Sequence, residues 1–279
     1  MIGLIHLASE KPFLGLSLNY KPICMTEKKF TGQVAIITGA GQGIGFEIAR
    51  QMAANGAAVL INDINLALLN EAAVVITAEG GTCHPMAGDA ADIAFIQQMV
   101  DAAVEHFGKL TIAIANAGIT LFGDFLTYPA SSLQSVMNLN LQGSFFLAQR
   151  AAQQMIKQET GGSILFMSSV TGHQAHKYLA AYGMTKAALE MLAKSLVVEL
   201  SPYQITVNTV APGATLTERT LEDADYVNTW ARITPMGRPA TVADVSNTVL
   251  FLVSPDSGHI TGQNLIVDGG WTAVSPSPY

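Results

Sequence analysis

Charged residues and cysteine are both scarce in this chain of 279 residues. Charged side chains make up 13% of it, against 49% hydrophobic ones, and its two cysteines are Cys24 and Cys83. Two cysteines do not make the disulfide framework of a small secreted protein, and they suit the reducing cytosol. We therefore expect a cytoplasmic location.

Basic clusters and long apolar runs are also missing. The net charge is -7 and no stretch is rich in lysine and arginine, so we expect no nucleic-acid partner and no anionic membrane surface. No uninterrupted apolar run reaches the ~18 residues of a membrane-spanning helix. The apolar composition then indicates a sheet covered on both faces, because the strands of such a sheet are continuous apolar runs.

Residues 1–28 differ from the rest of the chain. They show no helix or strand period, and no charged start precedes their first apolar residues, so they are a poor secretory signal. Met25 offers a second plausible start. We interpret 1–28 as an N-terminal extension, either a poorly ordered arm or a misassigned start, and 29–279 as a single domain.

From Gln33 onward, short apolar runs alternate with segments of helical pattern. The runs are VAIIT (34–38), AAVLIN (57–62), LTIAIAN (110–116), SILFMSS (163–169), ITVNTVA (205–211) and NLIVD (264–268). The helical segments 46–56 and 94–108 both end at glycine, a usual helix stop. Such alternation predicts an α/β fold, a doubly wound parallel sheet of the Rossmann-like kind.

A glycine-rich turn, TGAGQGIG (38–45), directly follows the first apolar run and opens a helix. Glycines let the backbone turn tightly and approach a pyrophosphate, which then lies at the helix N-terminus. An ordinary glycine-rich turn is the alternative, but the strand before and the helix after favour a dinucleotide site. The contacts predicted here are Gly39, Gln42, Gly43, Ile44 and Gly45.

Asp63 ends the second apolar run, about where dinucleotide folds place an acid that binds the ribose hydroxyls. The alternative is an exposed aspartate in a turn. The carboxylate would face the 2′-phosphate of NADP, and the neighbouring Ile64 offers no compensating positive charge. We therefore predict NAD as the cofactor.

A tyrosine and a lysine four residues apart occur in YGMTK (182–186), inside a segment of helical pattern. Positions i and i+4 share one helix face, so the phenol and the ammonium lie side by side. A tyrosine is a poor base at neutral pH, and a nearby cation stabilises its phenolate. Alone, the spacing also fits an exposed pair on a helix.

The G-x-x-x-G-x-G spacing of the glycine-rich turn, followed by YGMTK, resembles the compact branch of the short-chain dehydrogenase/reductase family. The resemblance covers about 30–272 and implies an oxidoreductase that moves hydride between NAD(H) and a secondary alcohol or ketone. A sugar, a polyol or a hydroxy acid would all be suitable small-molecule substrates. Two alternatives remain: a catalytically silent dinucleotide-binding regulator, and a lyase or epimerase.

The resemblance assigns roles to four residues. The implied catalytic set is Asn140, Ser169, Tyr182 and Lys186. Tyr182 is implied as the general acid/base and Lys186 as the ligand of the nicotinamide ribose, so both also contact the cofactor. Ser169 would hold the substrate oxygen, with Ser168 as its alternative. Asn140 would anchor a water behind the lysine, with Asn138 as its competitor.

The resemblance also implies further cofactor contacts at the ends of strands. Asp89 and Ala90 would lie at the adenine edge, and Asn116 belongs to an NAG motif (116–118). Thr215 and Thr217 belong to PGATLT (212–217), which would contact the carboxamide. Thr215 stands where the family usually has an aliphatic residue.

Four expectations concern the remaining segments. His173 and His176 are not completed by other ligands, so we expect no metal site; the polar loop 173–178 around them is a candidate lining of the substrate mouth. The segment 216–235 is expected to form a lid over the substrate. The family pairs helices such as 131–158 and 181–200, which implies a homo-oligomer, most simply a two-fold symmetric tetramer.

Overall fold

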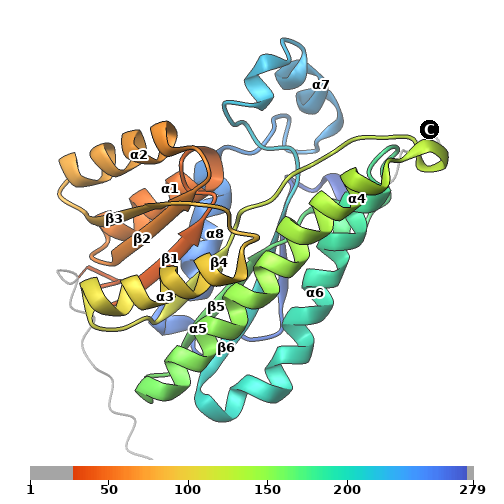
Figure 1. Cartoon of the computed structure of the whole chain (residues 1–279). Coiled ribbons are helices and arrows are strands. Elements are labelled where there is room, and N and C mark those ends of the chain that lie inside the picture. Colours follow the sequence, from red (N-terminus) through yellow and green to blue (C-terminus); the bar gives the residue numbers. More distant parts are fainter. Residues whose placement is uncertain (1–27, 275–279) are drawn as a thin grey trace, which may run out of the picture.

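A parallel sheet of seven strands lies at the centre of the structure, a computed structural model that describes residues 28–274 (Figure 1). The strands are β1 (Val34–Thr38), β2 (Ala58–Asp63), β3 (Thr82–Ala87), β4 (Ile112–Ala115), β5 (Gly162–Met167), β6 (Ile205–Pro212) and β7 (Asn264–Val267). Their order is β3-β2-β1-β4-β5-β6-β7. Successive strands are added on one side of β1 up to β3 and on its other side from β4 onward, so the strand order reverses between β1 and β4. The predicted doubly wound fold is therefore confirmed. The predicted extension lies outside the described residues, Lys28 excepted.

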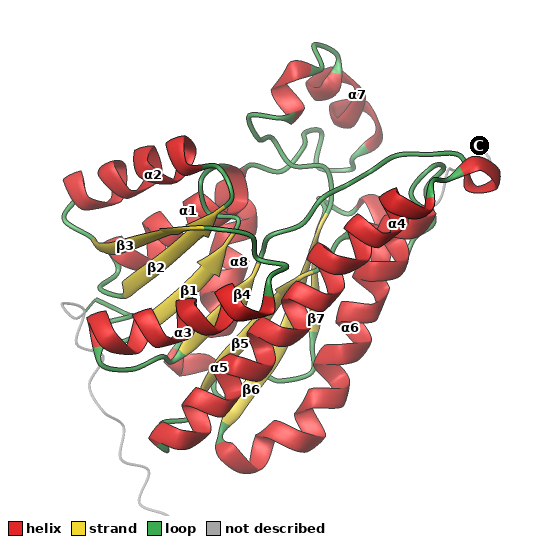
Figure 2. Ribbon diagram, in the orientation of Figure 1, coloured by secondary structure: helices red, strands yellow, loops and turns green. Residues whose placement is uncertain are grey.

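Helices cover both faces of this sheet (Figure 2). They are α1 (Gly43–Ala54), α2 (Leu66–Ala78), α3 (Ile93–Phe107), α4 (Ala130–Val136), α5 (Ser144–Gln158), α6 (Ala180–Leu200), α7 (Tyr226–Ile233) and α8 (Val242–Val253). One apolar core lies between the sheet and α1, α2 and α8, and a second lies between the sheet and α3, α5 and α6. Phe30, just before β1, is fully buried and belongs to the core beneath α1, α2 and α8.

The central strand β1 explains the apolar composition. All five of its residues are buried. Ala35 and Ile37 belong to the core beneath α1 and α8, whereas Val34 and Ile36 belong to the core beneath α3 and α5. A strand covered on both faces has no side for polar residues, as the continuous run VAIIT predicts.

The strand β3 departs from the pattern of apolar runs. Its sequence, TCHPMA, has no apolar run, so this strand is not visible among the apolar runs of the sequence. Asp89 lies two residues beyond its end. β3 pairs only with β2, through which Pro85 lies opposite Ile61. A proline is tolerated on an edge strand because its missing N–H faces no neighbour.

The helix expected over 131–158 is present, but its middle is π-helical rather than α-helical. This π-helical turn, Met137–Gly143, connects α4 directly to α5. Turns of this type insert an extra residue and are frequent at functional sites. The buried Asn140 lies within it.

The segment 216–235 leaves the carboxyl edge of the sheet and carries α7, which stands apart from the main body at the top of Figure 1. No residue of α7 is buried. Among residues 28–274, no helix combines the length and the apolar composition needed to cross a membrane.

Candidate active site

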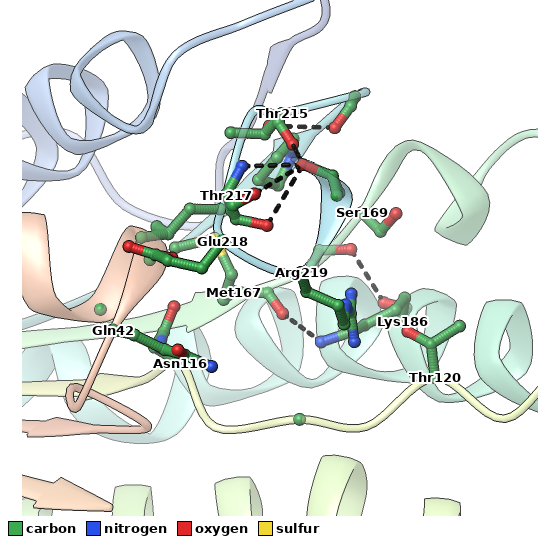
Figure 3. A pocket seen from close by; sticks show the side chains of 18 of the residues that line it. Gln42, Asn116, Thr120, Met167, Ser169, Lys186, Thr215, Thr217, Glu218 and Arg219 are labelled. Atoms are coloured by element: carbon green, nitrogen blue, oxygen red, sulfur yellow. Dashed lines mark hydrogen bonds between the residues drawn. The ribbon is translucent and has the colours of Figure 1, made fainter. Parts of the chain in front are cut away.

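A pocket opens at the carboxyl ends of the strands, next to the reversal of strand order (Figure 3). Ligands of open α/β sheets bind at this place, where neighbouring connections diverge. Its lining consists of Gln42, Gly43, Ile44, Gly45, Asn116, Gly118, Thr120, Met167, Ser168, Ser169, Tyr182, Lys186, Pro212, Gly213, Thr215, Thr217, Glu218, Arg219, Thr220 and Tyr226. Most of the predicted site residues are thus brought together.

The glycine-rich turn supplies one end of the pocket. Gly39 and Gly43 have φ angles of 62° and 63°, a conformation that favours glycine. A side chain on Gly45 would overlap the Gly39 carbonyl oxygen. The first turn of α1 has no acidic residue, and its N-cap residue Gln42 makes no side-chain cap. The N–H groups there are free of a side-chain cap, so the turn fits the pyrophosphate of a dinucleotide.

Asn116 fixes this glycine-rich turn. Its side-chain nitrogen donates to the carbonyl oxygens of Thr38 and Gly39, both at 2.9 Å. The Thr38 hydroxyl in turn accepts the backbone N–H groups of Asn116 and Ala117, both at 3.1 Å. Four hydrogen bonds therefore join the end of β1 to the end of β4.

Asp63 lies in a second hollow beside the first, which Asp89 and Ala90 also line. One carboxylate oxygen of Asp63 accepts the Gly41 N–H at 3.1 Å, and the other accepts the Asn65 N–H at 2.9 Å. The carboxylate is therefore held at the end of β2. Asp89 accepts the Ala91 N–H at 2.8 Å, within its own turn.

The helix α6 carries Tyr182 and Lys186 into the pocket on one face, as the spacing predicts. Lys186 is buried, with 4% of its surface exposed, and its Nζ donates to the Met167 carbonyl oxygen at 2.7 Å. The same nitrogen lies 5.4 Å from the centre of the Tyr182 ring. The pair is therefore part of the pocket wall, which excludes the alternative of an exposed helical pair.

Two serines follow β5, and their hydroxyls differ in what they contact. The Ser168 hydroxyl is 2.8 Å from a carboxylate oxygen of Glu190 and 3.2 Å from the Lys186 carbonyl oxygen. The Ser169 oxygen accepts only a long hydrogen bond, 3.3 Å, from the Thr171 N–H. Its own proton has no acceptor among the described residues, so Ser169 is the serine with a hydroxyl to offer a ligand.

Asn140 is fully buried in the π-helical turn, and both polar atoms of its side chain are hydrogen-bonded. Its Oδ1 accepts the Ile119 N–H at 2.8 Å, and its Nδ2 donates to the Ile119 carbonyl at 3.0 Å and to the Thr185 hydroxyl at 3.3 Å. These bonds tie the segment after β4 to α6. The Asn140 carbonyl oxygen accepts the Ser144 hydroxyl at 2.8 Å. The water expected on Asn140 stays a prediction.

The turn after β6 closes the pocket opposite α1. Thr215 is buried, and its hydroxyl donates to the Gly213 carbonyl oxygen at 3.1 Å, so it is used within the turn. The methyl carbon of Thr217 lies 3.6 Å from where a side chain on Gly43 would begin. Thr217 is thus the threonine that faces the glycine-rich turn.

Several lining residues were not anticipated individually. Thr120, Arg219 and Tyr226 line the pocket from the segments after β4 and β6. The sequence predicts the lid as a whole segment, 216–235. It contains several polar residues, and their spacing does not show which of them face the pocket. Their position after carboxyl strand ends was the one available signal.

The loop 173–178 does not line this pocket, contrary to the expectation for the substrate mouth. His173 lies 3.4 Å from Glu190, whereas the His176 ring stacks on Trp271 at 4.9 Å. The two histidines therefore face different partners. No group of three metal-ligating side chains occurs within 28–274.

Comparisons with known proteins identify the family of the chain. A family model described as enoyl-(acyl carrier protein) reductase matches residues 39–272. An L-rhamnose 1-dehydrogenase (NAD(P)(+)) of Sphingomonas sp. (strain SKA58) is 36% identical over 250 residues, covering 87% of this chain and 97% of the relative. A diacetyl reductase [(S)-acetoin forming] of Staphylococcus epidermidis is 33% identical, covering 85% of this chain and 98% of its own.

Two solved structures extend the agreement to the fold. A short-chain type dehydrogenase/reductase from Mycobacterium marinum is 34% identical with a TM-score of 0.84, covering 88% of this chain and 98% of its own. A gluconate 5-dehydrogenase from Burkholderia cenocepacia, in complex with NADP and tartrate, is 32% identical with a TM-score of 0.82, covering 89% and 98%.

The fold, the pocket and these relatives together define an NAD(P)-dependent oxidoreductase of alcohols and ketones. The chain belongs to the short-chain dehydrogenase/reductase family. The relatives described above are enzymes, so the alternative of a catalytically silent regulator finds no support among them.

Proposed function

We propose that the chain uses NAD to interconvert a secondary alcohol and its ketone on a sugar, polyol or hydroxy acid. The observation that carries this proposal is the convergence of Ser169, Tyr182 and Lys186 at one end of a pocket whose other end is the glycine-rich turn. A bound NAD would supply the hydride acceptor. The relatives named for rhamnose, acetoin and gluconate support small hydroxylated substrates.

In the direction of oxidation, the chain's own residues handle the proton. Ser169 donates a hydrogen bond to the substrate oxygen and so fixes the reacting carbon. Tyr182 then accepts the hydroxyl proton, because the Lys186 ammonium 5.4 Å from its ring stabilises the phenolate. Met167 holds that ammonium in place through its carbonyl oxygen. Fixing base and substrate around one carbon lowers the barrier by proximity as well as by proton transfer.

Asn140 has a supporting role in this proposal. Its side chain ties Ile119 to Thr185, the residue before Lys186. It thereby holds α6 against the segment after β4. A water on its backbone would link Lys186 to solvent, so that the proton taken up by Tyr182 can leave.

We propose NAD rather than NADP because of Asp63. At an effective dielectric of about 20, two unit charges 4 Å apart repel by ~4 kcal/mol before solvent screening. Even after heavy discounting, a 2′-phosphate beside Asp63 would give roughly a hundredfold preference for NAD. The neighbouring Ile64 is 74% exposed and carries no charge to offset this repulsion.

The test of the cofactor is a double substitution, Asp63→Ser with Ile64→Arg. It should reverse the preference, measured as the ratio of kcat/KM for the two cofactors. The single Ile64→Ser variant, which keeps the carboxylate, is the matched control and should still prefer NAD. Equal efficiency of the unmodified enzyme with both cofactors would refute the role of Asp63.

We further propose a homotetramer in the cytoplasm. A mostly apolar groove runs between α4, α5 and α6, with Phe145 41% and Met191 63% exposed. A second copy placed on this groove by two-fold symmetry would cover both side chains. Light scattering at micromolar concentration should give four times the chain mass, and Met191→Glu should lower it. A monomeric unmodified protein would overturn the assembly, and recovery outside the cytoplasmic fraction would overturn the location.

The substrate is tested by a panel of sugars, polyols, hydroxy acids and their ketones, assayed by NADH absorbance. Steady NADH formation with a secondary alcohol is the expected result. A lyase, an epimerase or a silent regulator would show no net NADH formation with any compound.

A further inference from the structure

The lid places one arginine inside the catalytic pocket. Arg219 lies in a turn that Thr220 fixes, since the Thr220 hydroxyl contacts the Thr215 carbonyl oxygen at 3.1 Å and accepts the Thr217 N–H at 2.8 Å. These hydrogen bonds hold the backbone of the turn that carries Arg219. The Arg219 side chain is exposed and lines the pocket.

Three charged side chains line the pocket: Lys186, Glu218 and Arg219. Lys186 donates to the Met167 carbonyl oxygen and lies beside the Tyr182 ring. A carboxylate oxygen of Glu218 lies 3.6 Å from the position where a side chain on Gly43 would begin, at the N-terminus of α1. Arg219 takes part in none of the ion pairs among residues 28–274.

Glu218 and Arg219 point in different directions (Figure 3). Glu218 is directed toward Gln42, on the side of the glycine-rich turn, and Arg219 is directed away from it. In the same view Arg219 lies on the side of Lys186 and Thr120, in the pocket that Ser169 and Tyr182 also line.

We propose that Arg219 binds the carboxylate of the substrate, so that the preferred substrates are hydroxy acids. This inference rests on the proposed function and narrows its substrate class. Ser169 and Tyr182 address the reacting oxygen, and Arg219 approaches the same space from the lid. A guanidinium is planar and offers paired N–H donors that match the two oxygens of a carboxylate.

Two other anions fit the same arginine less well. A phosphate dianion carries two negative charges, more than one guanidinium balances. The pyrophosphate of the cofactor belongs at the N-terminus of α1, the end toward which Glu218 rather than Arg219 is directed. A carboxylate with one charge is the anion that a single guanidinium matches.

The experiment compares paired probes at saturating NAD: D-gluconate against D-glucitol, and lactate against propane-1,2-diol. Arg219→Gln should lower kcat/KM for the acids by about ten- to a hundredfold, mainly through KM, because a charge-assisted hydrogen bond is lost. The neutral partners should change less than about twofold. Arg219→Lys should recover part of the loss, since it keeps the charge but not the paired donors.

Arg232→Gln is the matched control, because Arg232 also lies on the lid, in α7, but does not line the pocket. It should leave all four probes unchanged. A raised KM for NAD in Arg219→Gln, with acids and neutral compounds equally affected, would assign Arg219 to the cofactor and overturn the inference. A preference of the unmodified enzyme for the neutral compounds would overturn it as well, while leaving the proposed function intact.

A second measurement does not depend on turnover. Binding of D-gluconate to the complex of enzyme and NADH, followed by nucleotide fluorescence, should be lost in Arg219→Gln and kept in Arg232→Gln. If no probe is turned over, the proposed function fails while this binding result still decides the inference. Equal gluconate binding by the two variants, or none by the unmodified enzyme, would contradict it.

Discussion

The floor of the pocket and its lid are built in opposite ways. On the floor, Asn140, Thr185 and Lys186 are each at most 4% exposed, and each makes at least one side-chain hydrogen bond. In the lid, Leu221 is 63% exposed and α7 buries none of its residues. Under the proposed function, the residues that handle the proton lie in the well-packed part, and the segment expected to select the substrate lies in the part with few buried residues.

The lid is nevertheless attached at a small number of points. One of them is aromatic: Trp230 of α7 meets Trp271 edge-on at 4.8 Å, and within α7 Tyr226 lies 6.0 Å from Trp230. Trp271 also stacks on His176 at 4.9 Å. Burial lowers the pKa of His176, so this ring stays uncharged near neutral pH. The lid thus rests on the C-terminal turn and on the loop 173–178.

The largest effect is expected on the floor. Tyr182→Phe removes the proton acceptor but keeps the ring, so kcat should fall by about a thousandfold or more while the Kd for NADH stays within about twofold. Steady-state kinetics and nucleotide fluorescence give the two values. Retention of more than about a tenth of the turnover would assign the proton transfer to another group.

The two serines after β5 are expected to have different roles: Ser169 contacts the substrate, and Ser168 contacts other residues of the protein. Ser169→Ala should lower kcat/KM by about a hundredfold, because a donor to the developing charge on oxygen is lost. Ser168→Ala, which removes the contact with Glu190, should act mainly on stability. The same assay and a urea unfolding curve distinguish them. The reverse pattern would make Ser168 the substrate ligand.

A smaller effect is expected when the lid is loosened. Trp271→Ala removes the edge contact with Trp230 and should raise the substrate KM about three- to tenfold with little change in kcat, because the floor is untouched. Trp271→Phe keeps an aromatic edge and serves as the control. A fall in kcat as large as that of Tyr182→Phe would show that floor and lid are not independent.

The smallest effect concerns the first turn of α8, beyond the lid. Hydrogen bonds from Arg238 and Thr241 hold the pKa of Asp244 well below its usual range. Because the pKa is lower in the folded protein, the ionised carboxylate stabilises the fold at pH values above about 4, the ordinary carboxyl pKa. This stabilisation is lost as the pH falls from there through the lowered pKa. Asp244→Asn should therefore destabilise by about 0.5–1 kcal/mol at pH 7 and not in strong acid. Urea unfolding at both pH values measures this, and an equal loss at both would contradict it.

The sequence predicts the parts of the molecule whose residues interact with neighbours along the chain. Strands buried on both faces, such as β1, are visible as apolar runs, and Tyr182 and Lys186 share a face through helical spacing alone. The edge strand β3 has no such run, because one neighbour and partial exposure leave its composition free.

Features that depend on tertiary contacts could not be predicted. The π-helical turn at Asn140 forms where the side chain reaches the backbone of Ile119, 21 residues away in sequence. Nothing in the lid sequence distinguishes Arg219, which lines the pocket, from Arg232, which does not. Which side of a lid faces the pocket depends on how α7 packs on Trp271.

The central claim, that the pocket transfers hydride from a substrate carbon while Tyr182 takes the proton, is tested most directly by isotope transfer. The unmodified enzyme is given NAD and the best alcohol of the panel, deuterated at the carbinol carbon, and the NADH formed is analysed by mass spectrometry. The account predicts that the deuterium is found in the NADH, and that Tyr182→Phe forms almost none of this product. NADH formed without the label, or labelled NADH formed equally fast by Tyr182→Phe, would contradict it.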